Sequence, residues 1–396
     1  MIKDREIKEY ISKACNFLIN DQNEDGSWSM KNEKVKQPPI PYQKSLILTS
    51  QALQSLLFNV KPRYVDSMKK AINFCINYAL SPEDAVDLWA WKLDALELSN
   101  TEKSENIKEK SIQILEEKQE ENGSWPYYPD TFALTNYSVC NVINLTSQLT
   151  IARAIKWFNN SKKGSGWSKD DKDEQIEPSF TANAILSLIK LGETPPEETI
   201  KYLEEKQEES GGWRVLSDSG KWGDITSYST ALCILALILS KGNNEKIDKG
   251  ITYLLNCQDE KGKILRTPKE RETYHYLFYY VIKTLIIYLE SEKNINRFKE
   301  TKLREFIISC YKNVLTSRAL GVTERSRKRR IDILKSLGEE SKEVAEIIDS
   351  LKKKKEYEHL NKKSHITQIK SDVEYLRSIK LIGKIGNEYY ISLNLL

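Results

Sequence analysis

The sequence contains an acidic run at residues 170–174, Asp-Asp-Lys-Asp-Glu, whose side chains could do chemistry. Carboxylate oxygens are the ligands that Mg²⁺ prefers in proteins, and a bound Mg²⁺ could hold a diphosphate beside the run. Like charges in a row are also typical of a solvated loop that binds nothing. We favour the loop interpretation. Mg²⁺ therefore remains a possible cofactor, but not the favoured interpretation of this run.

Aromatic side chains form a second group that could act on a ligand. Tyr274, Tyr276 and Tyr279 fall on one predicted helix, and Trp89 and Trp91 fall on another. Such rings could line a cavity for an apolar ligand and stabilise a cation with their π faces. On a helix buried on both sides they could equally fill the core, and the sequence leaves both interpretations open.

Basic side chains are concentrated toward the C-terminus. Residues 291–396 carry 24 Lys and Arg against 15 Asp and Glu, so residues 1–290 have a net charge of −5 within a chain whose total is +4. Lys and Arg contact phosphates, which supply most non-specific affinity for nucleic acid. The candidate nucleic-acid contacts are Arg325, Arg327, Lys328, Arg329 and Arg330. A solvated helix face or a surface for a protein partner would explain the same residues.

The remaining composition restricts the class of protein. The chain has 396 residues, of which 39% are hydrophobic and 30% charged. No run approaches the roughly 18 apolar residues of a membrane span, and residues 1–6 do not resemble a signal peptide. Six scattered cysteines without a Cys-x-x-Cys pair indicate reduced core thiols. We expect a cytoplasmic protein with no membrane span.

A repeated unit must position these groups. A glutamine lies six residues before a tryptophan in three places: Gln22 and Trp28, Gln119 and Trp125, Gln207 and Trp213. In two weaker copies, Ser161 replaces the glutamine before Trp167, and Ile264 replaces the tryptophan after Gln258. Units spaced by about 40–50 residues stack on their neighbours, because none of them buries its apolar face alone.

Two kinds of predicted helix alternate between these units. Amphipathic outer helices are expected at residues 5–20, 65–80, 104–119, 150–160, 196–207 and 246–257. Inner helices, apolar nearly all round, are expected at residues 42–58, 83–98, 134–146, 179–191, 225–239 and 274–289. Six of each would close a ring. The unit itself is predicted to be structural, with a glycine that ends the outer helix, a tryptophan that covers the gap between hairpins and a glutamine that bonds backbone groups.

These units resemble the Gln-Trp motifs of squalene and oxidosqualene cyclases, and the hairpin series is similar to that of protein prenyltransferase β-subunits. The resemblance covers roughly residues 7–289. It implies an all-α domain at residues 1–290, an (α/α)6 toroid in which a double ring of helices surrounds a cavity for isoprenoid chains.

The resemblance also implies where an acid would lie. Class II cyclases of this family protonate an alkene or epoxide with a D-x-D-D motif that opens an inner helix just before Thr-Ala. Thr181 occupies that place in this chain, which puts Ser179 where the proton-donating aspartate belongs. Only Glu177 keeps a carboxyl group, so a relocated acid would have to use Glu177 and Asp173.

Protein prenyltransferases hold Zn²⁺ with an Asp-x-Cys and a Tyr-His at the starts of two inner helices. The resemblance gives Asp224 and His275 as candidate metal ligands, but Thr226 stands where the cysteine belongs. A hydroxyl is a poor ligand for zinc. Zinc is therefore a second candidate cofactor, and a structural role for His275 is favoured.

Residues 291–396 resemble a winged helix-turn-helix domain. Helices are expected near residues 298–320, 339–358 and 366–379, followed by two short strands at 381–385 and 389–392. The resemblance implies a small α+β domain that contacts nucleic acid or a protein partner.

We therefore predict a catalytically altered cyclase/prenyltransferase-like protein that acts as a binding module for an apolar or isoprenoid ligand, or for a protein partner. The alternative is an active isoprenoid-processing enzyme, either a class II cyclase or a zinc enzyme. A toroid with a filled cavity and a purely structural role is the third interpretation. The sequence predicts neither the identity of the ligand nor the oligomeric state.

Overall fold

The computed structural model describes residues 4–29, 42–58, 64–96, 99, 102–126, 136, 138–169, 174–216, 221–270, 273–291, 332–333, 342–352, 366–367, 369–373, 382–385 and 388–391. The chain divides into two compact units. The first contains Met1–Asn59 and Arg63–Leu289, and the second contains Val60–Pro62 and Glu290–Leu396.

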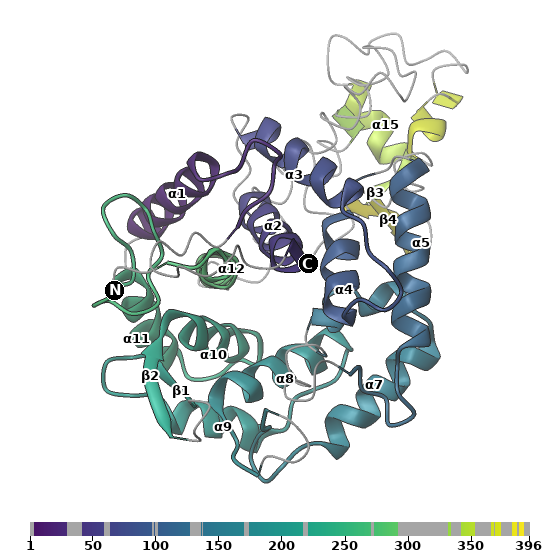
Figure 1. The fold of residues 1–396 in the computed structure, drawn as a ribbon. Helices are drawn as coiled ribbons and strands as arrows, with labels where there is room; N and C mark the ends of the chain where they lie inside the picture. The colour runs from purple at the N-terminus through teal and green to yellow at the C-terminus, as the bar shows by residue number, and fades with distance from the viewer. Residues whose placement is uncertain are drawn as a thin grey trace. The chain divides into compact units, whose positions relative to one another are not determined.

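The first unit is a ring of helical hairpins in two layers (Figure 1). In the described part of the chain, the outer layer consists of α1 (Asp4–Asn20), α3 (Val65–Asn77), α5 (Glu102–Glu117), α7 (Gln148–Asn160), α9 (Glu197–Glu205) and α11 (Asn244–Leu255). The inner layer contains α2 (Tyr42–Leu57), α4 (Val86–Leu96), α8 (Pro178–Lys190), α10 (Ser227–Leu239) and α12 (His275–Ser291). The predicted double ring of helices is therefore present.

The third inner segment is less regular than the others. Helix was predicted over residues 134–146. The structure shows helical backbone at Asn136 and at residues 138–140, then a turn and the short 3₁₀ helix η2 (Ile143–Leu145).

The tryptophan of each repeated unit joins the two layers. Its indole N–H donates to a carbonyl oxygen near the end of the preceding outer helix, over 2.6–2.9 Å: Trp28 to Leu18, Trp125 to Leu115, Trp167 to Phe158 and Trp213 to Leu203. Its backbone N–H donates, over 3.0–3.2 Å, to a side-chain oxygen of the following inner segment: Thr49, Asn136, Thr181 and Thr230. The predicted structural role of the unit is confirmed.

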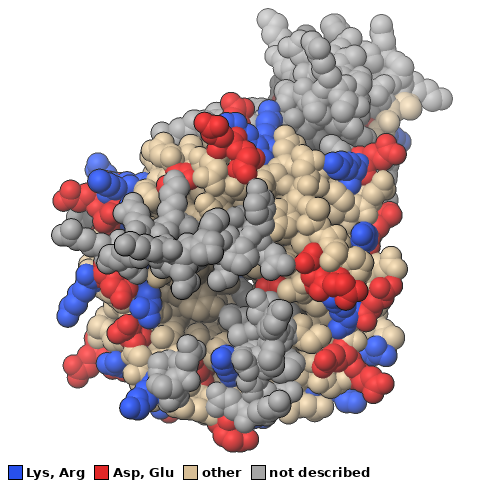
Figure 2. Space-filling model, in the orientation of Figure 1, with Lys and Arg blue, Asp and Glu red and all other residues tan. Residues whose placement is uncertain are grey.

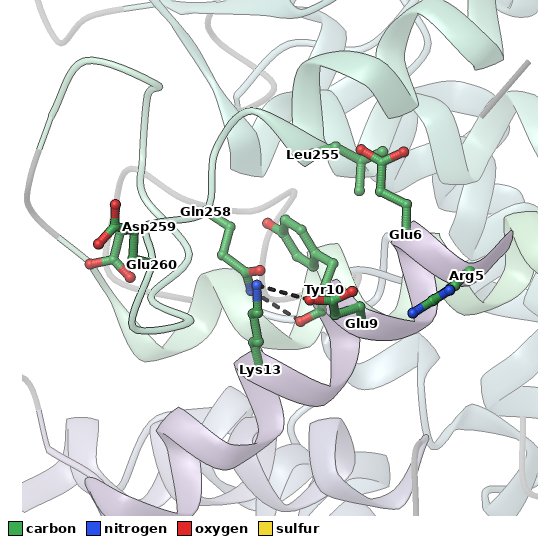
Figure 3. A pocket seen from close by; sticks show the side chains of 9 residues that line it. All are labelled: Arg5, Glu6, Glu9, Tyr10, Lys13, Leu255, Gln258, Asp259 and Glu260. Atoms are coloured by element: carbon green, nitrogen blue, oxygen red, sulfur yellow. Dashed lines mark hydrogen bonds and ion pairs between the residues drawn. The ribbon is translucent and has the colours of Figure 1, made fainter. Parts of the chain in front are cut away.

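The glutamine of each unit joins successive hairpins by a hydrogen bond. Its Nε2 donates over 2.8–3.0 Å to a backbone carbonyl of the next outer helix: Gln22 to Ser67, Gln119 to Thr150, Gln207 to Lys246 and Gln258 to Tyr10. The last of these bonds connects residues 248 positions apart and closes the ring (Figure 3). The same amide bonds its own turn, for example Gln207 to the carbonyl of Gly211 at 2.9 Å.

A hairpin that the sequence analysis did not predict precedes α10. Strands β1 (Trp213–Leu216) and β2 (Trp222–Thr226) pair in antiparallel fashion. Asp224 and Thr226 were expected to open the inner helix and instead belong to β2, so that prediction was wrong. The helix begins at Ser227 because Thr226 is its N-cap, whose Oγ1 accepts from the N–H of Ser229.

The second unit, described by itself, contains an antiparallel sheet of three strands in the order β3-β5-β4. Strand β3 (Lys342–Glu343) leads into α15 (Val344–Lys352), and β4 (Ile382–Ile385) pairs with β5 (Glu388–Ile391). Residues 366–367 and 369–373 are helical. The two predicted strands are present, whereas β3 was not predicted, because two residues are too few to show a period.

Two smaller expectations concern cysteines and membrane spans. Within the described residues, Cys15, Cys75, Cys140, Cys233 and Cys257 are buried and form no disulfide. Cys310 lies outside the described residues. None of the helices in the described ranges has both the length and the apolar character needed to cross a membrane.

Candidate functional site

The middle of the ring is the candidate site, and α4 presents a polar and aromatic face to it. The indole of Trp91 meets the ring of Tyr279 on α12 edge to face, with centroids 5.4 Å apart. In the ring, α2 lies between α4 and α12, so this contact is made across the interior (Figure 1). Asp87 and Asp94 lie four residues before and three residues after Trp91, which places them on the same helix face.

An aromatic wall continues this contact along α12. We define it as Phe58, Trp91, Tyr228, Tyr276, Tyr279 and Tyr280. Successive rings meet in edge-to-face or tilted contacts with centroids 4.9–6.2 Å apart. Tyr274 stacks on Tyr276 at 5.6 Å. The structure thus brings together four of the five candidate cavity residues.

Two rings of the wall keep part of their surface accessible. Tyr228 and Tyr276 are half-buried, and burial is the largest cause that raises the pKa of both hydroxyls, to about 12 for Tyr276. Figure 2 shows that this face of the molecule is hollowed near its centre, with most charged side chains toward the periphery.

Trp89, the fifth candidate, faces the other way. It belongs to the core between the layers, packed with Leu115 of α5 and with Trp125. The ammonium group of Lys110, also on α5, lies 5.5 Å from its ring centroid. Residues two apart on a helix point in nearly opposite directions, so Trp89 and Trp91 do not share a face.

Glu177 lies at the start of α8 and is 3% exposed. The hydroxyl of Ser179 donates to its Oε1, and the backbone N–H of Leu216 in β1 donates to its Oε2 over 3.3 Å. Both oxygens of the Glu177 side chain therefore lie beside hydrogen-bond donors. Asp173, the other candidate acid, lies outside the described residues.

Two lysines on the inner layer were not identified from the sequence. Lys283 on α12 donates to the hydroxyl of Tyr279 over 3.1 Å, and its pKa is lowered to about 7 by burial and by the nearby charge of Lys190. Lys190, the last residue of α8, is exposed, and partial loss of hydration lowers its pKa. The charge of Asp94 raises the pKa of both lysines. A single lysine within an otherwise apolar helix was the signal that could have found them.

The two candidate metal ligands have different partners. Asp224 is exposed and lies 3.4 Å from the guanidinium of Arg266. His275 is buried, and its Nε2 lies 2.8 Å from Oδ2 of Asp21, in the turn after α1. Among the described residues, no group of three or more His, Cys, Asp or Glu side chains could hold a metal ion. The structure supports a structural role for His275, which ties α12 to the first hairpin.

A separate groove of about 490 Å³ lies where α1 meets the loop after α11 (Figure 3). Both acidic and basic side chains line it, and Lys13 pairs with Glu9 at 3.2 Å. The hydroxyl of Tyr10 is buried there without a hydrogen-bond partner in the described part of the chain. None of the predicted site residues lines this groove. The candidate nucleic-acid contacts at residues 325–330 lie outside the described residues.

Comparison with family models identifies two overlapping matches. Residues 58–222 match the squalene-hopene cyclase C-terminal domain, and residues 179–314 match the prenyltransferase alpha-alpha toroid domain. Dammaradiene synthase from Dryopteris crassirhizoma is 29% identical to this chain over 154 residues. That match covers 30% of this chain and only 22% of the synthase.

Solved structures show the same fold at low sequence identity. The type II terpene cyclase MstE from Scytonema, as a variant in complex with the substrate geranylgeranyl dihydroxybenzoate, superposes with a TM-score of 0.55 at 14% identity, over 73% of this chain and 99% of that one. A polysaccharide lyase superposes with a TM-score of 0.52 at 11% identity, over 74% of this chain and 99% of that one. Because one fold carries such different chemistries, these likenesses establish the architecture alone.

The helical double ring and its repeated units define an α/α toroid. The two family models match this toroid over residues 58–222 and 179–314, so the chain is similar to terpene cyclase-like α/α toroids in that region.

Proposed function

We propose that the toroid is a binding module for an apolar ligand of isoprenoid type and that it does not carry out class II protonation. The aromatic wall carries this proposal. Its rings come from four inner helices or their ends and meet across the interior. Trp91, Tyr279 and Tyr280 are buried among them, and Tyr228 and Tyr276 keep accessible surface that a hydrocarbon chain could contact. The substrate complex of MstE supports an isoprenoid as the ligand class.

The contacts of Glu177 support the absence of protonation. An acid for an alkene must keep its proton until it transfers it, which requires surroundings that disfavour the carboxylate. In this chain Ser179 stands where the proton-donating aspartate belongs, and its hydroxyl and the Leu216 amide both donate to Glu177, the carboxyl group that remains there. Purified protein should therefore form no product from squalene, oxidosqualene or geranylgeranyl diphosphate. Turnover of any of these that is lost in Glu177→Gln would show that the toroid is an enzyme.

Binding is tested by titrating the protein with geranylgeraniol and following tryptophan fluorescence or heat. Trp91→Leu removes a ring of the aromatic wall and should weaken binding about tenfold or more, since loss of aromatic contact area costs roughly 1.5 kcal/mol or more. Trp89→Leu is the matched control, because the same residue type is removed from the outward face of the same helix. An equal effect of both substitutions, or no binding by the wild type, would contradict the proposal.

We further propose that the second unit is a winged-helix-like domain. Its order of elements supports this: a strand, a helix, a second helical segment and a final hairpin that share one antiparallel sheet. The basic residues 325–330 and the net positive charge of residues 291–396 favour nucleic acid as its partner.

A further inference from the structure

The groove between α1 and the loop after α11 is built on a departure of α1 from the repeat. The backbone carbonyl that accepts a glutamine bond belongs to the third residue of its outer helix in three places: Ser67 in α3, Thr150 in α7 and Lys246 in α11. In α1 it belongs to Tyr10, the seventh residue. Residues 4–7 therefore extend α1 by one extra turn, roughly 6 Å. Arg5 and Glu6 lie on this turn and line the groove.

Tyr10 itself is a second departure. At two of the corresponding positions a hydroxyl bonds a neighbouring side chain: that of Ser67 donates to Oε1 of Gln22 over 2.7 Å, and that of Thr150 lies 3.0 Å from the hydroxyl of Ser147. Tyr10 lines the groove and is 5% exposed, yet its hydroxyl has no hydrogen-bond partner among the described residues. A buried hydroxyl without a partner costs free energy, so the packing of the ring does not account for this tyrosine.

The middle of the groove combines apolar surface with this hydroxyl. Figure 3 shows the ring of Tyr10 directed from α1 into the space between Gln258 and Leu255. Leu255, the last residue of α11, is half-buried. The amide of Gln258 is already used, because its Nε2 donates to the backbone carbonyl of Tyr10 over 3.0 Å. A ligand in the groove would therefore meet a leucine, an aromatic ring and one free phenol group.

Carboxylates outnumber cations around this middle part. The described side chains that line the groove include four acidic ones and two basic ones, a net charge of −2: Glu6, Glu9, Asp259 and Glu260 against Arg5 and Lys13. Two of the carboxylates come from α1 and two from the loop, on opposite sides of the groove (Figure 3). In the described part of the chain, no three His, Cys, Asp or Glu side chains are grouped closely enough to hold a metal ion. The arrangement therefore suits an organic cation with positive charge at both ends.

We propose that this groove binds a linear polyamine. Its ammonium groups lie at the carboxylates of α1 and of the loop, and its alkyl segment lies against Leu255 and the ring of Tyr10. One N–H donates to the Tyr10 hydroxyl, which gains the partner that it lacks within the described chain. Hydrogen bonds from an ammonium group to carboxylates are charge-assisted and short. This site lies on the outer layer and does not depend on the ligand of the interior.

Three probes test the number of charges that the groove recognises: spermidine, putrescine and butylamine, each titrated calorimetrically into the full chain. Butylamine has the alkyl chain of putrescine but only one ammonium group. The two polyamines should bind at least about tenfold more tightly than butylamine, and added salt should weaken them, because the carboxylates are partly exposed. Butylamine that binds as tightly as putrescine, or spermidine that does not bind at about 50 mM salt, would overturn the inference.

Tyr10→Phe tests the hydroxyl. This variant should bind spermidine about threefold to tenfold more weakly, the range expected for one hydrogen bond. It should keep the free energy of unfolding of the wild type, because the hydroxyl has no bond to lose within the described chain. A purely structural tyrosine would give the opposite pair of results, and unchanged affinity for spermidine would overturn the inference.

The repeat supplies a matched control for the carboxylates. Glu260 lies two residues after Gln258, and Glu121 lies two residues after Gln119 in a turn that no extra helical turn faces. Glu260→Gln should weaken spermidine about twofold to fivefold, as expected for a partly exposed ion pair, and so should Glu6→Gln. Glu121→Gln should leave the affinity unchanged. Equal effects of Glu121→Gln and Glu260→Gln would overturn the inference, because the amine would then bind any acidic turn.

Discussion

Gly211 allows the sharpest test of how the ring is held together. Its φ is +93°, and a Cβ added there would lie 2.3 Å from the carbonyl oxygen of Lys249 in the next outer helix. The chain provides a control in Gly192, whose φ is +84° and whose added Cβ would meet nothing within 4 Å. Both positions require the left-handed backbone, but only Gly211 also requires close approach of two hairpins.

The two alanine variants should lose different amounts of free energy of unfolding, because only Gly211→Ala pushes two neighbouring hairpins apart. Gly192→Ala should lower the free energy of unfolding by about 1–2 kcal/mol, the cost of a left-handed alanine. Gly211→Ala carries the same cost and must also shift the turn away from α11. The shift strains the two bonds of the Gln207 amide, to Gly211 at 2.9 Å and to Lys246 at 2.8 Å. At about 1 kcal/mol for each bond, the total loss should reach about 3–4 kcal/mol.

Urea unfolding followed by far-ultraviolet circular dichroism measures the free energy of unfolding of both variants and of the wild type. The dependence of this free energy on urea concentration should be the same for all three, which shows that each exposes the same surface when it unfolds. Gln207→Leu supplies an independent value for the two bonds and should account for most of the difference between the alanine variants. Equal losses for Gly192→Ala and Gly211→Ala would refute the reasoning, because the close approach would then contribute nothing.

Three further predictions concern other parts of the chain. Gln258→Leu removes the bond that closes the ring on Tyr10 and should destabilise the protein by about 1–2 kcal/mol, whereas no loss in urea unfolding would show that closure does not depend on it. Folding lowers the pKa of Lys283 from 10.5 to about 7. Between pH 7 and pH 10.5 the unfolded chain therefore binds a proton that the folded chain does not. The free energy of unfolding should rise with pH in this window, by at most about 1.4 kcal/mol per pH unit. Unfolding measured from pH 6 to 10 should show this rise in the wild type and its absence in Lys283→Met. The full-length protein should bind duplex DNA or RNA more weakly as salt increases, and replacing the arginines of residues 325–330 by alanine should flatten that dependence; binding independent of salt would favour a protein partner.

The repeated units could be predicted because each of their interactions is encoded locally. A glutamine, a glycine and a tryptophan within seven residues are enough to place a helix end, and the structure gives every such tryptophan the same pair of hydrogen bonds. The hairpin of β1 and β2 was missed because Trp222–Thr226 runs directly into the apolar pattern of α10. Ile225 and Thr226 are β-branched, a preference that the helical period outweighed in the prediction.

The candidate site was harder to predict, because inner helices that are apolar nearly all round do not show which face turns inward. Trp89 and Trp91 look equivalent in the sequence and lie on opposite faces of α4. Long-range partners leave no signal at all: His275 pairs with Asp21 across 254 residues. Lys283 was the detectable exception, because removing part of a lysine side chain from water costs free energy, and the rest of its helix face is apolar.

The closure of the ring has a consequence during synthesis of the protein. Helix α1 leaves the ribosome before the rest of the ring, and its partner Gln258 follows Tyr10 by 248 residues. At about 5–20 residues per second, α1 waits roughly 12 to 50 seconds for the loop that completes its surroundings. During that time Ile7, Ile11 and Leu18, all fully buried in the finished ring, lack part of their cover. The nascent first hairpin is therefore the segment on which we expect a chaperone to act.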